Sequence, residues 1–405
     1  MPKPELLPGD VQLVRRLNRD AVLRLIRERG PISRTALARL ARLTPVTAFS
    51  IVDELIGREL VRERGIGPSV GGRRPMLFEA RTDAFAAIGI NIRSSEVRGV
   101  LTQLDARPLA TVVRAYDLNA GAPIVQLTVE VIRELIARSP LPIERLLGIG
   151  LAVPGLVDVA RGVVVESQNW GWQELPLRAI LAQQLELPIY LEEDDNALAL
   201  GEGFFGAGRG VANAICIKVG RGMGAGIIIN GRLYRGPDNT AGEVAHMMVD
   251  PEGPRCDCGN YGCLVRLVSA PAIAERAIKA LKQGATSSLR AEVEGNLDRV
   301  NMAMVAHAAN AGDAFACQIM MDVGRYLGIG IATLVNLLNP DLVIIGGGVS
   351  LVGAPLFEPI RQGVAIRALK TPGERVKIVP ALLGVDAPAI GAAVLVMIEQ
   401  GVLPT

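Results

Sequence analysis

The chain has 405 residues, with 43 Lys and Arg against 41 Asp and Glu, and a formal net charge of +2 at pH 7. A chain of this length is too long for one ordinary hydrophobic core, which indicates two or three domains. The near balance of basic and acidic residues excludes a uniformly basic or acidic protein. Residues 1–81 hold 16 basic against 9 acidic residues, whereas the remainder holds 27 against 32. We therefore expect the N-terminal part to contact a polyanion.

The first residues, MPKPELLPGD, lack the apolar stretch of a signal peptide, and no window approaches twenty uninterrupted apolar residues. We therefore expect no membrane span and a cytoplasmic protein. The five cysteines are an odd number in a chain of this length, and three of them fall within eight residues. This count and clustering argue against a disulfide framework.

Three helices are predicted near the N-terminus, over residues 11–29, 34–41 and 45–58. Gly30-Pro31 ends the first helix, Ser33 can cap the second, and Thr44-Pro45 is a favourable start for the third. Apolar residues at helical spacing predict the faces that these helices bury: Val14, Leu17, Val22, Leu25 and Ile26; Ala36, Leu37 and Leu40; and Phe49, Val52, Leu55 and Ile56.

The second and third helices, joined by a tight turn, are typical of a helix-turn-helix, whose second helix enters the major groove N-terminus first. Candidate DNA contacts are therefore the accessible residues at that start: Thr44, Val46, Thr47 and Ser50. Two short strands, around 60–62 and 76–78, then flank the glycine-rich loop ERGIGPSVGGRRP. Its Arg73 and Arg74 suit a narrow minor groove, which predicts a winged helix-turn-helix over residues 1–82 that binds double-stranded DNA. The alternative is a small helical interaction module.

The body, residues 83–405, shows a pattern that partly repeats. Three strands, a helix and a strand are predicted over 84–92, 96–104, 109–116, 123–137 and 146–155. A similar order returns at 212–220, 224–231 and 232–235, with a helix at 314–338 and a strand at 341–348. This repetition predicts a mixed α/β domain of two lobes with a ligand cleft between them.

A metal site is predicted by the spacing H-x9-C-x-C-x4-C, formed by His246, Cys256, Cys258 and Cys263. One imidazole and three thiolates complete a tetrahedral Zn²⁺ shell with no open position for water, so the zinc would be structural. The alternative of free core cysteines explains this clustering poorly. The other two cysteines, Cys216 and Cys317, are expected to be small buried residues, and His307 to lie on a helix face.

The residues resemble the ROK family of repressors and sugar kinases over nearly the whole chain. The resemblance is carried by the zinc stretch, the GGRRP wing and four further motifs: LAVPGLVD (151–158), NWGW (169–172), EEDDNALALGE (192–202) and IIGGGVS (344–350). It implies a two-lobed, actin-like sugar-kinase (RNase H-like) fold behind the head. It also implies a repressor more than an activator, acting as a homodimer or a dimer of dimers, with a sugar or sugar derivative as effector.

The same resemblance implies a set of ligand-binding residues. Asn169 matches a sugar-contacting asparagine, and Asp194 matches the aspartate that acts as general base in the kinases. Glu243 and His246 match a GExxH pair that hydrogen-bonds the sugar. His246 would then use one ring nitrogen for zinc and the other for the ligand.

Three departures from the kinases favour a ligand-controlled regulator over the alternative, an ATP-dependent sugar kinase with a DNA-binding head. Asn91-Ile92-Arg93-Ser94-Ser95 replaces the glycine-rich DxGGT-like phosphate loop, and Gly220-Arg221-Gly222-Met223-Gly224 lacks the threonine of GTGxG. Val265 stands where sugar-binding members have a glutamate. Arg221 leaves the effector open between a neutral sugar and an acidic or phosphorylated one, although it can equally be a surface residue.

Overall fold

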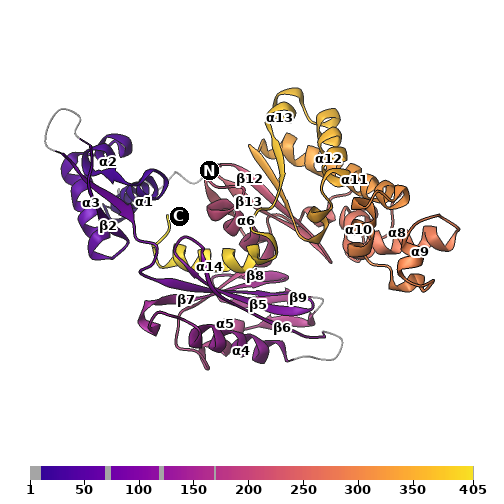
Figure 1. Cartoon of the computed structure of the whole chain (residues 1–405), viewed down its shortest axis with the longest axis horizontal. Coiled ribbons are helices and arrows are strands. Elements are labelled where there is room, and N and C mark those ends of the chain that lie inside the picture. Colours follow the sequence, from indigo (N-terminus) through magenta and orange to yellow (C-terminus); the bar gives the residue numbers. More distant parts are fainter. Residues whose placement is uncertain (1–10, 69–73, 118–122, 168–169, 405) are drawn as a thin grey trace, which may run out of the picture.

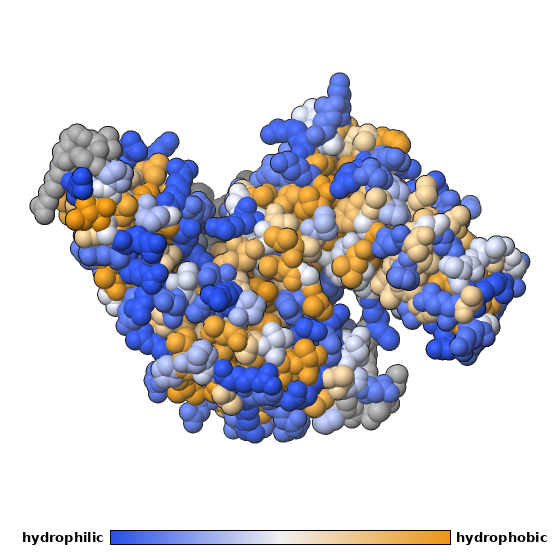
Figure 2. All heavy atoms as spheres, viewed as in Figure 1, coloured by the Kyte–Doolittle hydropathy of each residue, from blue (hydrophilic) through white to orange (hydrophobic). Residues whose placement is uncertain are grey.

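The computed structural model describes residues 11–68, 74–117, 123–167 and 170–404. The chain forms a small head at one end of an elongated molecule, followed by two α/β lobes (Figure 1). Hydrophilic and hydrophobic residues are interspersed over the face seen in the space-filling view (Figure 2).

Three helices and a three-stranded antiparallel sheet make up the head, with strand order β1-β3-β2. Its elements are α1 (Val11–Arg29), β1 (Ile32–Ser33), α2 (Arg34–Ala41), α3 (Pro45–Gly57), β2 (Val61–Ile66) and β3 (Met76–Ala80). The hydroxyls of Ser33 and Thr44 accept backbone N–H bonds from Ala36 and Thr47, so both predicted N-caps are confirmed. Strands β2 and β3 form the hairpin of a winged helix-turn-helix.

The buried faces of these helices differ in part from the prediction. Val14 and Leu17 are 51% and 42% exposed, so the first half of α1 does not bury this apolar face in the head core; Arg15 of the same half pairs with Glu54 of α3. Leu40 is also exposed, and its neighbour Ala38 is buried instead. The predicted core residues Val22, Ile26, Leu37, Val52 and Leu55 are buried, together with Ala48 and Ile51 of α3; Leu25, Ala36, Phe49 and Ile56 are half-buried.

The first lobe holds a five-stranded sheet of order β11-β7-β4-β5-β6. Its strands are β4 (Ala86–Ile92), β5 (Glu96–Gln103), β6 (Pro108–Ala115), β7 (Leu146–Val153) and β11 (Ile189–Glu193). Helices α4 (Ile124–Ala137) and α5 (Leu177–Ala182) cover one face (Figure 1). A small second sheet contains β8 (Leu156–Asp158), β9 (Val163–Ser167) and β10 (Trp172–Leu175).

The second lobe repeats this topology with the order β14-β13-β12-β15-β16. Its strands are β12 (Ala214–Val219), β13 (Met223–Ile229), β14 (Arg232–Tyr234), β15 (Leu342–Gly346) and β16 (Lys377–Pro380). Its helices are α6 (Asp194–Phe205), α7 (Val265–Val268), α8 (Ala270–Lys282), α9 (Leu289–Glu292), α10 (Met302–Asn310), α11 (Ala314–Leu338), α12 (Ala354–Arg367) and α13 (Lys370–Arg375). In each lobe, three antiparallel strands precede two parallel ones, so the predicted repetition is confirmed.

Helix α11 is long and apolar enough, by length and composition, to cross a membrane. Half of its most apolar window is buried inside the protein, and the helix packs along α12. Such burial is typical of a core helix, and α11 supplies much of the core of the second lobe.

The last helix, α14 (Ala387–Glu399), returns to the first lobe and packs on β4, β7 and α6. Glycines allow this close approach, since a Cβ at Gly89 would lie 1.8 Å from the carbonyl oxygen of Ala389 and one at Gly391 would lie 1.6 Å from that of Ala197. Helices α6 and α14 therefore lie side by side between the two sheets (Figure 1).

The head is docked on the body through both apolar and polar contacts. One hydrophobic cluster includes Val22 and Leu55 of the head together with Val394 and Met397 of α14. Arg58, which follows α3 directly, donates to the carbonyl oxygens of Gln400 and Gly401 at 3.2 and 3.1 Å. Glu59 accepts two bonds from Arg145 of the first lobe, at 2.9 and 3.1 Å. The end of α3 is thus joined to both the end of α14 and the first lobe.

Candidate functional site

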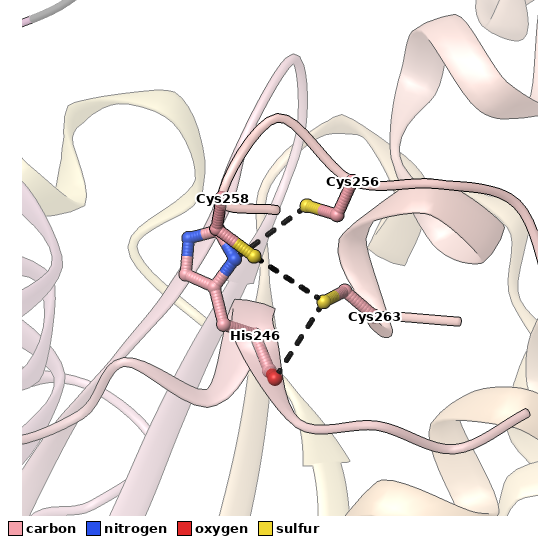
Figure 3. A group of neighbouring side chains, drawn as sticks. All are labelled: His246, Cys256, Cys258 and Cys263. Atoms are coloured by element: carbon pink, nitrogen blue, oxygen red, sulfur yellow. Dashed lines mark hydrogen bonds between the residues drawn. The ribbon is translucent and has the colours of Figure 1, made fainter. Parts of the chain in front are cut away.

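The predicted metal ligands come together in one loop of the second lobe. The ligand atoms of His246, Cys256, Cys258 and Cys263 all lie within 4.8 Å of one another. The Nδ1 atom of His246 lies 3.7 Å from the sulfur of Cys256, and the sulfurs of Cys258 and Cys263 are 3.6 Å apart (Figure 3). Ligands about 2.3 Å from a tetrahedral ion are about 3.8 Å apart, so this set fits a bound metal ion.

The backbone holds the metal loop as a folded-back hairpin. Met248 pairs with Cys263 and Arg255 with Tyr261 through isolated antiparallel bridges. Gly262 has φ +63°, and a Cβ there would lie 1.5 Å from the carbonyl oxygen of Asp250, so only glycine fits. In this hairpin the side chains of His246 and the three cysteines converge on one another (Figure 3).

Two of the thiols have opposite electrostatic surroundings. A backbone N–H bond from Asn260 lowers the pKa of Cys258 to about 7, with support from neighbouring thiols and His246. Burial raises the pKa of Cys263 to about 12. A divalent cation would supply the positive charge that both thiolates require.

The predicted ligand residue Asp194 begins α6 and forms an ion pair with Lys218 of β12. The ammonium group of Lys218 also lies 2.9 Å from a carboxylate oxygen of Asp195. Burial lowers the pKa of Lys218, but the two carboxylates outweigh burial, and the net pKa is raised. One cation from the second lobe therefore holds both carboxylates at the start of α6.

Glu243 belongs to the same electrostatic cluster. Burial and the charges of Asp195, Asp194 and Glu243 raise the pKa of Glu193 to about 9. Burial also raises the pKa of Asp195 to about 6, against the opposing effect of Lys218. The charge of Glu243 thus acts on both Glu193 and Asp195. His246 follows in the same 3-10 turn, η4 (Val244–His246), and leads into the metal loop.

Asn169, the remaining predicted sugar contact, lies outside the described residues. The adjacent Trp170 is described, and its indole N–H donates to the hydroxyl of Tyr116 at 3.1 Å. The Tyr116 hydroxyl in turn donates to the carbonyl oxygen of Arg93. Trp170 is therefore linked through Tyr116 to the β4–β5 turn of the first lobe.

The two turns that the motif resemblance matches to kinase phosphate loops differ in structure. In the first lobe, Glu96 pairs with both Arg93 and Arg98, and Arg98 pairs with Asp386 at 2.9 Å, so side chains fill the turn region. In the second lobe, Gly220 and Gly222 have open space where a Cβ would stand. Arg221 between them is exposed. Val265 packs against the core of the second lobe and begins α7.

Four of the DNA-contact candidates, Thr44, Val46, Thr47 and Ser50, lie at the N-terminal end of α3. Val46 is 80% exposed, Thr44 and Ser50 are exposed, and Thr47 is half-buried. Arg74 is exposed beside β3, whereas Arg73 lies outside the described residues. Thr44, Val46 and Ser50 are therefore accessible at the N-terminal end of α3.

Several charged groups around the start of α6 were not predicted from the sequence. Lys218 stands in the apolar strand AICIKV, and a lone charge in a buried strand is a usable signal for an internal ion pair. Glu192 is 1% exposed and is held by Arg235 at 2.6 Å and by Asn196 at 3.1 Å. The pairing of Glu192 with Arg235 has no counterpart in local sequence spacing. Of the other cysteines, Cys216 is buried as expected, whereas Cys317 is only half-buried.

The chain is similar to known transcriptional regulators over almost its whole length. The chain is 32% identical to the xylose repressor of Caldicellulosiruptor bescii over 393 residues, covering 97% of this chain and 98% of that protein. It is 33% identical over 393 residues to the DNA-binding transcriptional dual regulator NagC of Escherichia coli, covering 96% and 94%.

Solved structures show the same relation. A ROK family transcriptional regulator, a homologue of the Escherichia coli MLC protein, superposes with a TM-score of 0.81 at 27% identity, covering 96% of this chain and 98% of that chain. A ROK family glucokinase from Streptomyces griseus, in complex with glucose and AMPPNP, gives a TM-score of 0.67 at 31% identity, with 76% and 98% covered. The family model described as the ROK family matches residues 88–399. The chain therefore belongs to the ROK family, as the resemblance of its motifs predicted.

Proposed function

We propose that this protein is a DNA-binding transcriptional repressor whose affinity for its operator is controlled by a sugar or sugar derivative. The observation that carries the proposal is the extent of the match. The similar repressors cover at least 96% of the chain, head included, whereas the glucokinase covers only 76%. The head is thus the part that the repressors share with this chain and the kinase lacks.

The proposed DNA interface combines α3 with the wing. Thr44, Val46, Thr47 and Ser50 would contact base edges and phosphates in the major groove. Arg73 and Arg74 would contact the adjacent minor groove, where a narrow A·T-rich segment attracts guanidinium groups. We place the boundary of the DNA-binding domain at residue 82, between the end of β3 at Ala80 and the start of β4 at Ala86.

The proposed effector site consists of Asn169, Asp194, Glu243 and His246. Carboxylates and an imidazole can pair with the hydroxyls of a neutral polyol. We propose zinc as the metal, with a structural role. His246 would bind it through Nδ1, which faces the thiols, and its Nε2 would stay available to the sugar (Figure 3).

Several features favour a regulator over a kinase. Arg93, Glu96 and Arg98 occupy the first phosphate turn, where a kinase needs close backbone approach. Asp194 is held by Lys218, whereas a general base must be free to accept the sugar proton. We therefore infer that Asp194 holds a sugar hydroxyl in this protein. The competing kinase function rests on the retained Asp194 and the glycines at 346–348.

The route from effector to DNA follows from packing. Asp194 begins α6, α6 lies along α14, and the carbonyls at the end of α14 accept from Arg58 after α3. A sugar that shifts α6 would change the docking of the head, and in a dimer it would change the spacing of two heads. Half-sites about 34 Å apart require one such spacing, so the sugar would shift a population between two head arrangements. A cytoplasmic homodimer or dimer of dimers fits this scheme.

The test begins with an operator selected in vitro from random DNA by the full-length protein. Fluorescence anisotropy then measures binding with and without a panel of hexoses, pentoses, amino sugars and sugar phosphates. We expect one sugar to weaken operator binding. Arg73→Ala with Arg74→Ala should weaken binding and reduce the salt slope by about 1 per lost phosphate contact.

Two outcomes would contradict the proposal. ATP-dependent phosphorylation of a sugar at steady turnover would support the kinase instead. If the salt dependence of operator binding were unchanged in the double variant, the wing would not be part of the DNA interface. Arg299→Ala, an exposed arginine of the second lobe, is the matched control and should leave operator binding unchanged.

A further inference from the structure

A cavity of about 320 Å³ lies where the head meets the body. Its walls come from α1, the second half of α6, the loop after α6, the β13–β14 turn and Pro404 near the C-terminus. None of Asp194, Glu243 and His246 lines it, so it is separate from the effector site proposed above. The head and the second lobe face each other across a hollow in the outline of the molecule (Figure 2).

The cavity has an apolar floor and a cationic rim. Leu200 and Phe205 of α6 and Ile228 of β13 supply apolar wall. Three arginines also line it: Arg24 and Arg27 from the head and Arg209 from the body; the acidic lining residues are Glu28 and Asp105. Among the described residues, none of these three arginines has a carboxylate within the 4.0 Å of an ion pair.

Arg27 shows that this positive charge is poorly compensated. Its guanidinium lies over the ring of Phe205, 5.6 Å from the centroid, and donates to the carbonyl oxygen of Leu104 at 2.9 Å. Burial is the largest cause of the lowered pKa of Arg27, about 10; the charge of Asp105 raises this pKa and the charge of Arg209 lowers it. A bound anion would remove this electrostatic cost, because an opposite charge stabilises a partly buried guanidinium.

We propose that this cavity binds a small organic anion, a carboxylate or a phosphate monoester, with its charged group between Arg27 and Arg209 and its apolar part on Leu200 and Phe205. The volume is at the lower end of the range for small-molecule sites, so a single-ring ligand fits and a dinucleotide does not. The ligand would touch α1 of the head and the body at once. It would thereby hold the head in its docked arrangement, a second control of DNA binding beside the sugar.

The experiment measures thermal unfolding of the full chain at constant ionic strength with 5 mM phenyl phosphate or phenylacetate. Inorganic phosphate and neutral benzyl alcohol are the comparison compounds. A ligand of the folded state raises the melting temperature, and we expect a rise of about 2 °C or more with an organic anion and none with the comparison compounds. A rise with phenyl phosphate alone assigns the phosphate monoester, and a rise with phenylacetate alone assigns the carboxylate.

Variants locate the effect. Arg209→Glu should abolish the rise, and Ala212→Phe, at an exposed position lining the cavity, should block it sterically. Arg299→Glu makes the same charge change at an exposed site elsewhere and should keep the rise. Hydrogen exchange over residues 21–29 of α1 should slow when the anion binds.

Failure of both organic anions to raise the melting temperature overturns the proposal, as does a rise that persists in Arg209→Glu and Ala212→Phe. An equal rise with inorganic phosphate overturns the apolar part of the site. The measurement needs neither operator nor sugar, so its failure leaves the proposed repressor function untouched.

Discussion

The two lobes share one sheet topology but use it differently. Both have three antiparallel strands followed by two parallel strands, with the β4–β5 turn of one matching the β12–β13 turn of the other. The first turn is filled by the Arg93–Glu96–Arg98 network, whereas the second keeps open glycines and carries Lys218 on the strand before it. The second lobe alone has the His246 and cysteine loop. The two lobes thus keep one sheet topology, while the side chains at corresponding turns differ.

The largest effect is expected from a substitution in the metal loop of the second lobe. Cys258→Ser removes one of four ligands, and we expect loss of bound zinc and a fall in melting temperature of more than about 5 °C, because metal binding and folding of such a loop are coupled. Elemental analysis and thermal melting measure both. Cys317→Ser, outside the cluster, is the control and should retain one zinc per chain. Full zinc content in Cys258→Ser would show that the loop is not the metal site.

The next effect concerns the ion pairs of the second lobe. Lys218→Met leaves Asp194 and Asp195 without their shared cation, and breaking such a buried pair costs about 3 kcal/mol. Urea unfolding of the full chain measures this loss. Adding Asp195→Asn to Lys218→Met should restore part of the stability, because one uncompensated carboxylate is removed. If the double variant were no more stable than Lys218→Met, the loss of stability would come from altered packing and not from the uncompensated charge.

A smaller effect is expected on the pH dependence of stability, through Glu193 at the junction of the lobes. The folded pKa of Glu193 is raised from 4.5 to about 9, so the folded protein holds a proton that the unfolded chain releases. Its contribution to stability is present below about pH 4.5 and is lost as the pH rises towards 9. Glu193→Gln cannot lose a proton, so its melting temperature should fall less between pH 5 and pH 9. Parallel pH profiles of the two proteins would contradict the raised pKa.

The smallest effect tests the first lobe. Glu96→Gln weakens the pairs with Arg93 and Arg98, which are partly exposed, so we expect a loss of about 1 kcal/mol or less. Burial raises the pKa of Glu96, but the two arginines outweigh burial and the net pKa is lowered. The contribution of Glu96 is therefore present near neutral pH and is lost as the pH falls through its folded pKa. Thermal melting at pH 7 and pH 3 measures it. A loss of stability equal to that of Lys218→Met would mean that the ion pairs at the two turns contribute equally to stability.

Sequence patterns alone predicted the helix caps, the metal ligands and the repeated lobes of this protein. The caps at Ser33 and Thr44 and the four metal ligands are set by residues close in sequence, so their spacing predicted their structure. The alternation of strands and helices predicted the repeated lobes for the same reason. The exposed Val14, Leu17 and Leu40 were predicted to be buried, because helical periodicity identifies an apolar face but not whether another element covers it.

Tertiary structure alone decided how the parts are connected. Lys218 of β12 pairs with Asp194 of α6, Arg235 pairs with Glu192, and Arg58 donates to the residue after α14, more than 300 positions away in sequence. The cavity lined by Arg27 and Arg209 exists only because the head docks on the body. Ion pairs and cavities of this kind depend on distances between elements, and a single sequence encodes them only through the complete fold.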